Sequence, residues 1–355
     1  QSSAVHIQAL VSADGILPGS SSKLRLLVIN LALVPGGQLV NSQLHKASNV
    51  SGNFRRSYHL TQTITTFMKF WFLYFSFLLV FQNLANAQSK EPPFTVNEII
   101  DKIKQNVKPQ WVTTKTDTIV IGNAFDTVTG IATCMFADMN ILKRAVAAHC
   151  NLIITHEPIF YNATNTIPDF METDMVLKEK VAYIKEKKLT IFWFHDNAHR
   201  NDPDQILQGL AEELKWKIVS TSPWILEVKK KTLTSLANDV KRHFNVEGIR
   251  VIGNPNLEVS RVGLVPGLAP TLQMHIGVLH RDDVDVILVG EAREWEDYVY
   301  TKDAELQGKK KAAIFIGHLK SEEPGAKYCA DWLKTFVNGT NIAFLKNDNY
   351  WWSPK

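Results

Sequence analysis

The chain has 355 residues, of which 45% are hydrophobic and 21% are charged, and this composition is typical of a globular protein with one or two domains. Its formal net charge of +4 arises before Gln88, where six of the 39 basic residues but only one of the 35 acidic residues lie. The remaining 33 basic and 34 acidic residues are nearly balanced. The charge of the folded part therefore gives no reason to expect a nucleic-acid partner.

Residues 68–87 have the pattern of a secretory signal peptide. Met68 and Lys69 precede the apolar run FWFLYFSFLLVF, and the small residues Ala85 and Ala87 follow it as an A-x-A-like cleavage site. The alternative is a membrane anchor, but the run is shorter than the roughly 20 apolar residues that cross a bilayer. We expect cleavage after Ala87, a secreted or periplasmic protein, and no membrane attachment after cleavage.

Residues 1–67 precede this signal and mix Gly, Ser, Leu and Val without sustained periodicity. We expect this segment to be upstream sequence, non-native or disordered, and we leave it out of the predicted fold. Secretion would place the remaining chain in an oxidising compartment, where Cys134 and Cys150 are close enough in sequence to form a disulfide. The alternative is that both, together with Cys329, are buried thiols, because each lies in an apolar context.

From about residue 93, helical and strand patterns alternate along the chain. Apolar residues at helical spacing predict helices over 95–106, 139–150, 175–188, 202–216, 292–307 and 323–337. Short apolar runs predict strands over 117–122, 130–136, 152–154, 191–194, 284–290, 312–317 and 342–348. This alternation predicts an α/β fold, a mainly parallel sheet with helices on both faces.

The pattern changes over residues 224–267. A short strand, a helix and two further strands follow one another there, which indicates a small α+β insert domain. We therefore expect residues 88–223 and 268–355 to form one α/β core that the insert interrupts.

Three of the predicted core strands run directly into a histidine, namely His156, His195 and His318. In open parallel sheets, ligands bind outside the carboxyl ends of the strands, and the three histidines fall at that edge. A single histidine at a strand end is more often a hydrogen-bonded structural residue. Three of them, each with a neighbour that can bind a metal, favour a metal site.

Each of these histidines has a second candidate ligand close to it in the sequence. Glu157 is adjacent to His156, while His199 and Glu322 follow four residues after His195 and His318. Residues four apart lie on one face of a helix, so both can reach one ion. The candidate ligands are His156, Glu157, His195, His199, His318 and Glu322.

Six protein ligands exceed the three that a catalytic zinc usually takes, and they suit two divalent ions such as Zn, Fe, Mn or Ni. Two ions about 3.5–4 Å apart could share a carboxylate or a hydroxide. The other histidines after Gln88 are His149, which we expect to be structural, and His243, His275 and His280. The last three have no partner at a suitable spacing, and we expect them at the surface or at helix ends.

The order of these motifs resembles one protein family. GIATCMFADMNILKRAVAAHCNLIITHEPIF, FHDNAH, GIRVIGN, RVGLVPG, VGEAREWE and GHLKSEEPG resemble segments of the Nif-three-like dinuclear metal-centre proteins, some of which are known as GTP cyclohydrolase I type-two homologues. The resemblance covers residues 94–347. It implies a Nif-three-like fold, two metal ions and a homo-oligomer.

The chain departs from the family pattern at two positions. The family usually has a second histidine where this chain has Glu157, and an aspartate where it has His199. The two changes together keep four histidines and two carboxylates, so we expect the pair of ions to be retained. Glu291 and Glu294 resemble the polar residues beside the family's metals, where they would support the ligands or transfer protons. The alternative is that they are acidic residues at a helix N-terminus.

Two ions at a strand edge predict a dinuclear metal-dependent hydrolase that uses a metal-bound hydroxide, with Glu157 or Glu294 as the candidate base. We expect a small-molecule substrate that is phosphorylated or nucleotide-like. The cyclohydrolase resemblance implies GTP, although nothing else in the sequence points to guanine. The alternative function is a non-catalytic metal-binding or partner-binding scaffold.

Overall fold

The computed structural model describes residues 6–11, 27–33, 39–41, 93–352 and 354, and the chain divides into two compact units, Gln1–Gln88 and Ser89–Lys355. The first unit contains an antiparallel sheet of β1 (His6–Val11), β2 (Leu27–Leu33) and β3 (Leu39–Asn41). The sequence analysis expected no element there, although the apolar run of β2 is typical of a strand.

The predicted signal peptide, residues 68–87, lies outside the described residues, so its prediction is untested. Within the part of the chain that the structure describes, no helix combines the length and the apolar character needed to cross a bilayer. All three cysteines lie in the second unit, and all three are buried free thiols. This agrees with the alternative in which Cys134 and Cys150 form no disulfide.

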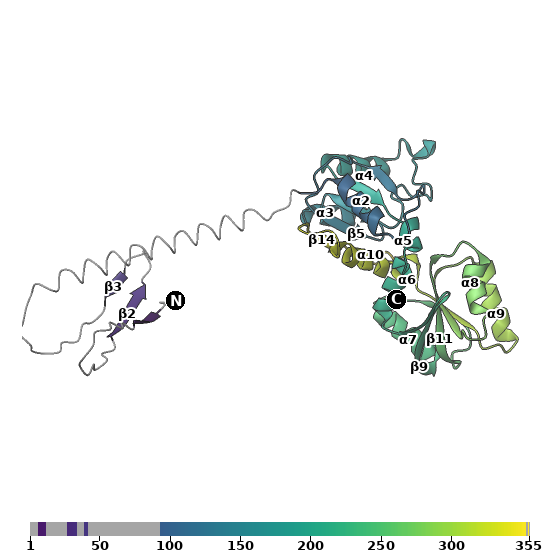
Figure 1. Ribbon diagram of the computed structural model, residues 1–355. Coiled ribbons are helices and arrows are strands. Elements are labelled where there is room, and N and C mark those ends of the chain that lie inside the picture. Colours follow the sequence, from purple (N-terminus) through teal and green to yellow (C-terminus); the bar gives the residue numbers. More distant parts are fainter. Residues whose placement is uncertain (1–5, 12–26, 34–38, 42–92, 353, 355) are drawn as a thin grey trace, which may run out of the picture. The chain divides into compact units, whose positions relative to one another are not determined.

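Two sheets organise the second unit (Figure 1). The first sheet has the order β14-β5-β6-β7-β4, in which β4 is antiparallel to β7 and the other pairings are parallel. Its strands are β4 (Thr118–Ile121), β5 (Ile131–Cys134), β6 (Leu152–Thr155), β7 (Thr190–Trp193) and β14 (Ile342–Phe344).

Helices cover both faces of the first sheet, as the sequence predicts. They are α2 (Val96–Asn106) and α10 (His318–Lys334) on one face, and α3 (Met139–Ala147) and α4 (Met175–Glu186) on the other. The alternation of side chains along a strand separates the two cores, since Leu152 and Ile154 of β6 pack with α2 and α10 while Ile153 packs with α3 and α4. Thr95 begins α2 with a capping box, in which Glu98 Oε2 accepts a hydrogen bond from Thr95 N at 2.7 Å.

The second sheet has the order β10-β13-β12-β11-β9-β8, with parallel pairings only from β11 to β12 and from β12 to β13. Its strands are β8 (Lys217–Thr221), β9 (Trp224–Thr232), β10 (Arg250–Ile252), β11 (Glu258–Leu268), β12 (Val286–Glu291) and β13 (Ala312–Phe315). The helices packed against it are α6 (Gln205–Leu214), α7 (Leu233–His243), α8 (Leu272–Leu279) and α9 (Val299–Leu306).

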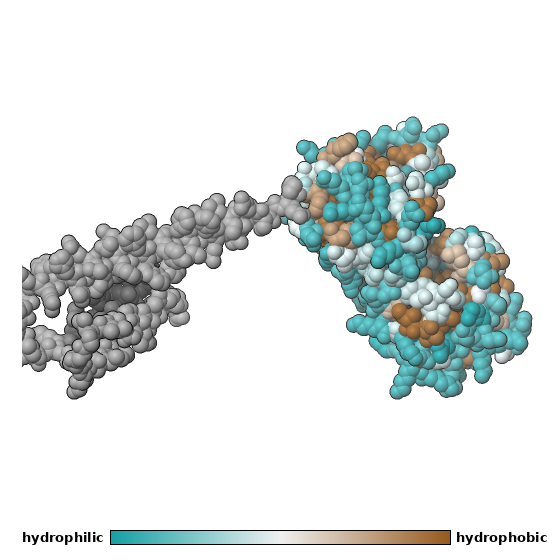
Figure 2. Space-filling view, viewed as in Figure 1, coloured by the Kyte–Doolittle hydropathy of each residue, from teal (hydrophilic) through white to brown (hydrophobic). Residues whose placement is uncertain are grey.

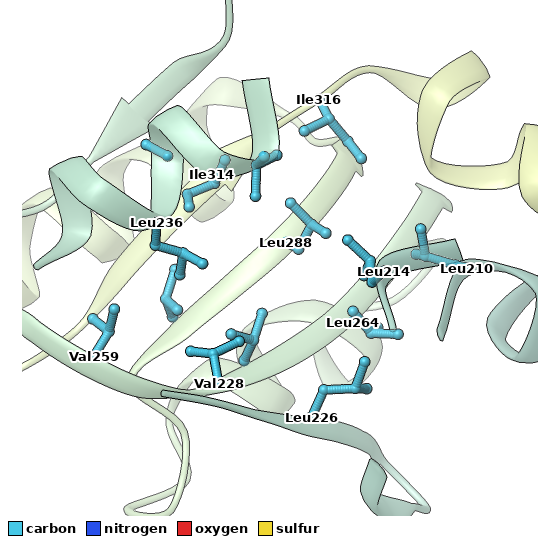
Figure 3. Close-up of a cluster of buried hydrophobic side chains, with 14 of the residues drawn as sticks. Leu210, Leu214, Leu226, Val228, Leu236, Val259, Leu264, Leu288, Ile314 and Ile316 are labelled. Atoms are coloured by element: carbon cyan, nitrogen blue, oxygen red, sulfur yellow. The ribbon is translucent and has the colours of Figure 1, made fainter. Parts of the chain in front are cut away.

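One apolar core of this sheet lies under α6 and α7. In Figure 3, Leu236 of α7 and Leu214 of α6 lie over the strands that carry Leu264, Leu288 and Ile314, and all five side chains are at most 5% exposed. Hydrophilic residues cover much of the visible surface of the second unit, and the apolar residues on that surface form separate patches (Figure 2).

The pairing of β12 and β13 differs from the expected single core sheet. The sequence analysis assigned both strands to the sheet of the histidine motifs, with residues 224–267 as an insert. In the structure Val286 of β12 pairs with Val262 of β11 and with Ala312 of β13, so the second sheet extends well beyond the expected insert. A fully buried apolar run indicates that a strand is internal, but it does not indicate which sheet the strand joins.

A close contact between α6 and α10 joins the two sheets. A Cβ atom on Gly209 would lie 2.5 Å from Pro324 O, and one on Gly325 would lie 2.4 Å from Ile206 Cδ1. Both glycines therefore allow the helix backbones to approach closely. The helix predicted from residue 202 begins only at Gln205, because Asp204 is its N-cap and accepts hydrogen bonds from the first turn.

Candidate metal centre

The first sheet brings two of the histidine motifs to one edge. β6 and β7 are parallel neighbours, with Thr155 opposite Trp193, so the residues after them emerge side by side. His156 and Glu157 follow β6, while His195 follows β7 and begins α5 (Asp196–Arg200). The adjacent parallel pairing therefore explains why these motifs meet.

The third motif comes from the first turn of α10. His318 is the first residue of this helix and Glu322 lies one turn later, so both project from one face. Gly317, before the helix, has a φ of 85°, a conformation that residues with a side chain rarely adopt. This glycine permits the sharp turn between β13 and α10.

Each of the two carboxylates lies between two imidazoles. Glu322 Oε2 is 3.0 Å from His318 Nε2 and 3.5 Å from His156 Nε2. Glu157 Oε1 is 3.2 Å from His318 Nε2 and 3.9 Å from His195 Nε2. The carboxylates thus connect all three motifs.

The remaining histidine completes a group of three imidazoles. The rings of His156 and His195 stack with centroids 4.6 Å apart, and the ring of His199 lies 5.1 and 4.9 Å from them. Each of these three histidines offers one ring nitrogen, and the three nitrogens lie within 4.8 Å of one another. One ligand atom from each of His156, Glu157 and Glu322 likewise lies within 4.8 Å of the other two. The structure therefore gathers all six predicted ligands, which we call the six-residue cluster.

The chemistry of the cluster fits a divalent metal. His156 is 4% exposed, and its Nε2 atom has no hydrogen-bond partner, although a buried nitrogen is normally satisfied. Burial and the neighbouring charges of His156 and His199 lower the pKa of His195, which favours the neutral imidazole that binds metals. Imidazole nitrogens and carboxylate oxygens suit Zn, Fe, Mn or Ni.

Charge balance within the cluster depends on His318. Burial opposes its protonation, but hydrogen bonds to Glu157, Glu291 and Glu322 outweigh burial and raise the pKa of His318 to about 12. Burial would raise the pKa of Glu322, whereas the nearby imidazoles of His156 and His318 hold that pKa well below its usual range. The Glu322 carboxylate is therefore ionised and available to a cation.

Aspartates orient two of the histidines, and the sequence analysis missed them. Asp117 Oδ1 accepts a hydrogen bond from the backbone N of His195 at 2.7 Å, and the ring Nδ1 of His195 lies 2.9 Å from Asp196 Oδ1. Asp204 Oδ2 lies 3.2 Å from His199 Nδ1. Partners of the ring nitrogen, such as Asp196 and Asp204, fix the ring orientation of metal-binding histidines. Asp204 could have been found from its helix-capping position near His199, but Asp117 is 78 residues before His195 and left no local signal.

The second sheet supports the first turn of α10. Gly267, near the end of β11, has a φ of 59°, and a Cβ atom there would lie 2.0 Å from Glu322 Oε1. Its N–H donates to Ser321 Oγ at 2.9 Å, and that hydroxyl donates to His318 O at 2.8 Å. The Glu322 carboxylate therefore packs directly against the backbone of Gly267.

The two further glutamates occupy different places. Glu291 ends β12, and its Oε2 is 3.4 Å from His318 Nδ1, as expected for a residue beside the cluster. Glu294 begins the π-helical turn η2 (Glu294–Tyr298), is 74% exposed and pairs with Arg250 at 3.3 Å. Among the described residues, no contact joins Glu294 to the cluster. Its expected role as a base or support has no basis in this geometry, because η2 directs it towards β10.

A pocket of about 800 Å³ opens beside His318 and Glu291. Arg293 contributes a cationic side chain to its wall, and Tyr298 and Trp351 contribute aromatic rings. The pocket is large enough for a small organic molecule, and it reaches the cluster through His318.

An α/β protein of two sheets, with imidazoles and carboxylates gathered after strand ends of both sheets, belongs to the class of candidate metal-binding proteins. The family described as Duf34/NIF3 (NGG1p interacting factor 3) matches residues 94–349, and the chain belongs to this family. This confirms the resemblance found in the sequence and the Nif-three-like fold.

Individual relatives are distant. The chain is 23% identical over 245 residues to a GTP cyclohydrolase 1 type 2 homolog of Clostridium acetobutylicum, a match that covers 65% of this chain and 87% of the relative. Its fold is similar to that of protein SA1388 of Staphylococcus aureus, with a TM-score of 0.59, 14% identity, and coverage of 74% of this chain and 100% of the other. A Bacillus cereus protein related to NIF3 gives a TM-score of 0.56 at 14% identity, with coverage of 73% and 98%. The structural likenesses, at these identities, concern the fold alone.

Proposed function

We propose that the protein is a metal-dependent hydrolase of a small, phosphorylated or nucleotide-like molecule. The observation that carries the proposal is the convergence of six candidate ligands, among them a buried His156 whose Nε2 atom has no hydrogen-bond partner. Hydrolysis follows as the function because such a cluster lies beside a pocket of suitable size.

The six-residue cluster would hold two divalent ions, drawn from Zn, Fe, Mn and Ni. When bound, such ions polarise a phosphoryl or carbonyl oxygen and lower the pKa of water towards neutrality. Glu157 and Glu322, each between two imidazoles, would help the histidines to hold the ions.

The chain's own residues provide proton transfer and substrate binding. Glu291 is half-exposed at the pocket and contacts His318, so it is placed to accept a proton from a group in the pocket. The Arg293 guanidinium offers a partner for phosphate, and Tyr298 and Trp351 offer surfaces for a planar ring. The clostridial relatives' name, GTP cyclohydrolase 1 type 2 homolog, supports a nucleotide-like substrate.

The test uses the purified chain loaded with each of the four metals. Metal content is measured by mass spectrometry, and hydrolysis is assayed on p-nitrophenyl phosphate, a phosphodiester and nucleoside triphosphates. We expect the six-residue cluster to contribute about two ions per chain, and activity that a chelator and His318→Ala abolish. The matched control His280→Ala removes an exposed histidine outside the cluster and should leave both unchanged.

Metal binding without turnover of any of these substrates would contradict the hydrolase and favour the non-catalytic scaffold. Secretion after cleavage at Ala87 and homo-oligomer formation are separate proposals. N-terminal sequencing of exported protein and analytical ultracentrifugation test them.

A further inference from the structure

A second group of a histidine and two carboxylates lies apart from the six-residue cluster. His275 of α8 has its Nδ1 atom 2.8 Å from Asp297 Oδ1 and its Nε2 atom 3.5 Å from Glu296 Oε2, and both acids belong to η2. One ligand atom each from the three residues lies within 4.8 Å of the others. We call these residues the His275 group.

The sequence analysis expected His275 at the surface or at a helix end, and this was wrong. Its side chain is only 3% exposed. Val278 and Leu279 follow it at helical spacing and are buried against the second sheet, so His275 is on the buried face of α8. The acids that accompany it lie more than twenty residues away in sequence, which is why spacing did not reveal them.

Three buried polar atoms in this region have no hydrogen-bond partner. They are His275 Nε2, Asp297 Oδ2 and Thr301 Oγ1. Asp297 is 1% exposed and Thr301, one helical turn later, is fully buried. Buried polar atoms are normally satisfied, and leaving several together unsatisfied is costly, so the grouping points to a bound species that accepts their lone pairs.

The charges around the group favour a cation. Arg293 Nη1 is 3.2 Å from Glu296 Oε1, so Arg293 neutralises one carboxylate at the partly exposed rim. A protonated His275 would neutralise the second carboxylate, that of Asp297, but it would leave Asp297 Oδ2 and Thr301 Oγ1 without a hydrogen-bond partner. A divalent cation instead neutralises charge and takes up the free lone pairs.

The local backbone supports the same conclusion. Glu296 and Asp297 are adjacent, and an ordinary helix would separate their directions by about 100°. In η2 the turn is π-helical, a rare conformation that is often found at functional sites, and both side chains reach His275.

We propose that His275, Glu296 and Asp297 bind a divalent cation, separate from the six-residue cluster. One imidazole nitrogen and carboxylate oxygens form a donor set that suits Zn²⁺, and the Thr301 hydroxyl or a water completes the coordination. The ion joins α8 to η2, whose Tyr298 lines the pocket beside His318, so it stabilises that wall of the pocket.

The test measures Zn²⁺ bound to the full chain after removal of free metal. Asp297→Asn, which keeps the size of the side chain, and His275→Ala should each bind about one Zn²⁺ fewer per chain than the unchanged protein. His280→Ala, which alters an exposed histidine at the end of the same helix, should bind the same amount.

A double variant, Glu322→Gln with His318→Ala, separates this inference from the proposed function. It disrupts the six-residue cluster and should retain about one Zn²⁺. Replacing this ion by Co²⁺ should give d–d absorption bands. Equal Zn²⁺ contents of Asp297→Asn and the unchanged chain would overturn the inference, even if the hydrolase is confirmed. Absence of any Zn²⁺ from the double variant would also overturn it, and that readout does not depend on whether His275→Ala folds.

Discussion

The two sheets of the second unit use the ends of their strands differently. β6 and β7 of the first sheet deliver His156 and His195 directly into the six-residue cluster. The second sheet delivers His318 through the turn after β13, and it also delivers Gly267 and Glu291, which contact Glu322 and His318 on α10. The comparison teaches that strand ends of the first sheet supply candidate ligands, whereas those of the second sheet supply both a candidate ligand and residues that contact it.

The largest effect is expected when a candidate ligand itself is changed. Glu322→Gln removes the charge that faces both His156 and His318, so metal affinity should fall by more than the roughly 10- to 100-fold that loss of an outer partner causes. Isothermal titration with Zn²⁺ measures the change. The control Glu323→Gln alters the adjacent buried glutamate, which accepts a hydrogen bond from Asn347 N at 2.7 Å, and should retain the metal.

A change in the second sheet should reach the cluster through its support. Gly267→Ala places a Cβ atom against Glu322 Oε1 and also strains a left-handed backbone, so we expect roughly tenfold weaker metal binding and about 1–3 kcal/mol lower stability. Gly308→Ala is the matched control, because its φ is 72° but no atom lies within 4 Å. Equal metal affinities of the two variants would show that the second sheet does not support Glu322.

A smaller overall effect is expected at Asp204, the outer partner of His199, because its substitution introduces no backbone strain. Asp204→Asn keeps a side chain that can cap α6 but removes the negative charge beside His199 Nδ1, so metal affinity should fall about tenfold. Asp174→Asn makes the same change at the N-cap of α4 and should leave affinity unchanged. Competition with a zinc-sensitive dye measures both.

The smallest effect on the cluster is expected at Lys180, whose Nζ donates to Ile159 O at 3.0 Å in the loop after His156. Burial lowers the pKa of Lys180 to about 8, below the value of about 10.4 in an unfolded chain. Because the unfolded chain then binds the proton more tightly, stability should rise as pH increases from about 8 to 10.4, by at most about 3 kcal/mol.

Lys180→Met should lack this rise in the free energy of unfolding, while metal affinity should change little. Lys185→Met alters an exposed lysine of the same helix and should keep the rise. Urea unfolding at pH 7, 8, 9 and 10 measures the three proteins. A pH dependence in Lys180→Met equal to that of the unchanged chain would contradict the assignment.

Much of the site was predictable because its signals are local. Each of the three motifs combines an apolar strand with a histidine and a second ligand within four residues, and the structure gathers all six of these side chains. Glu294 was expected beside them from the family resemblance, but it lies in the π-helical turn η2 and pairs with Arg250.

Residues that act through distant contacts left no such pattern. Asp117 reaches His195 from another strand end, and His275 meets Asp297 across two helices. The sequence likewise did not reveal that β12 pairs with β11, a strand of the expected insert at 224–267, because buried strands of either sheet carry the same apolar residues.

The sequence by itself determined the α/β class, the alternation of helices and strands, the family and the six metal-binding candidates. Helical and strand periodicity, capping residues and short-range ligand spacing are properties of neighbouring residues, so they can be read along the chain. The tertiary structure alone decided the division into two sheets, the support of Glu322 by Gly267 and the burial of His275. These depend on which surfaces pack together, and residues far apart in the chain determine that jointly.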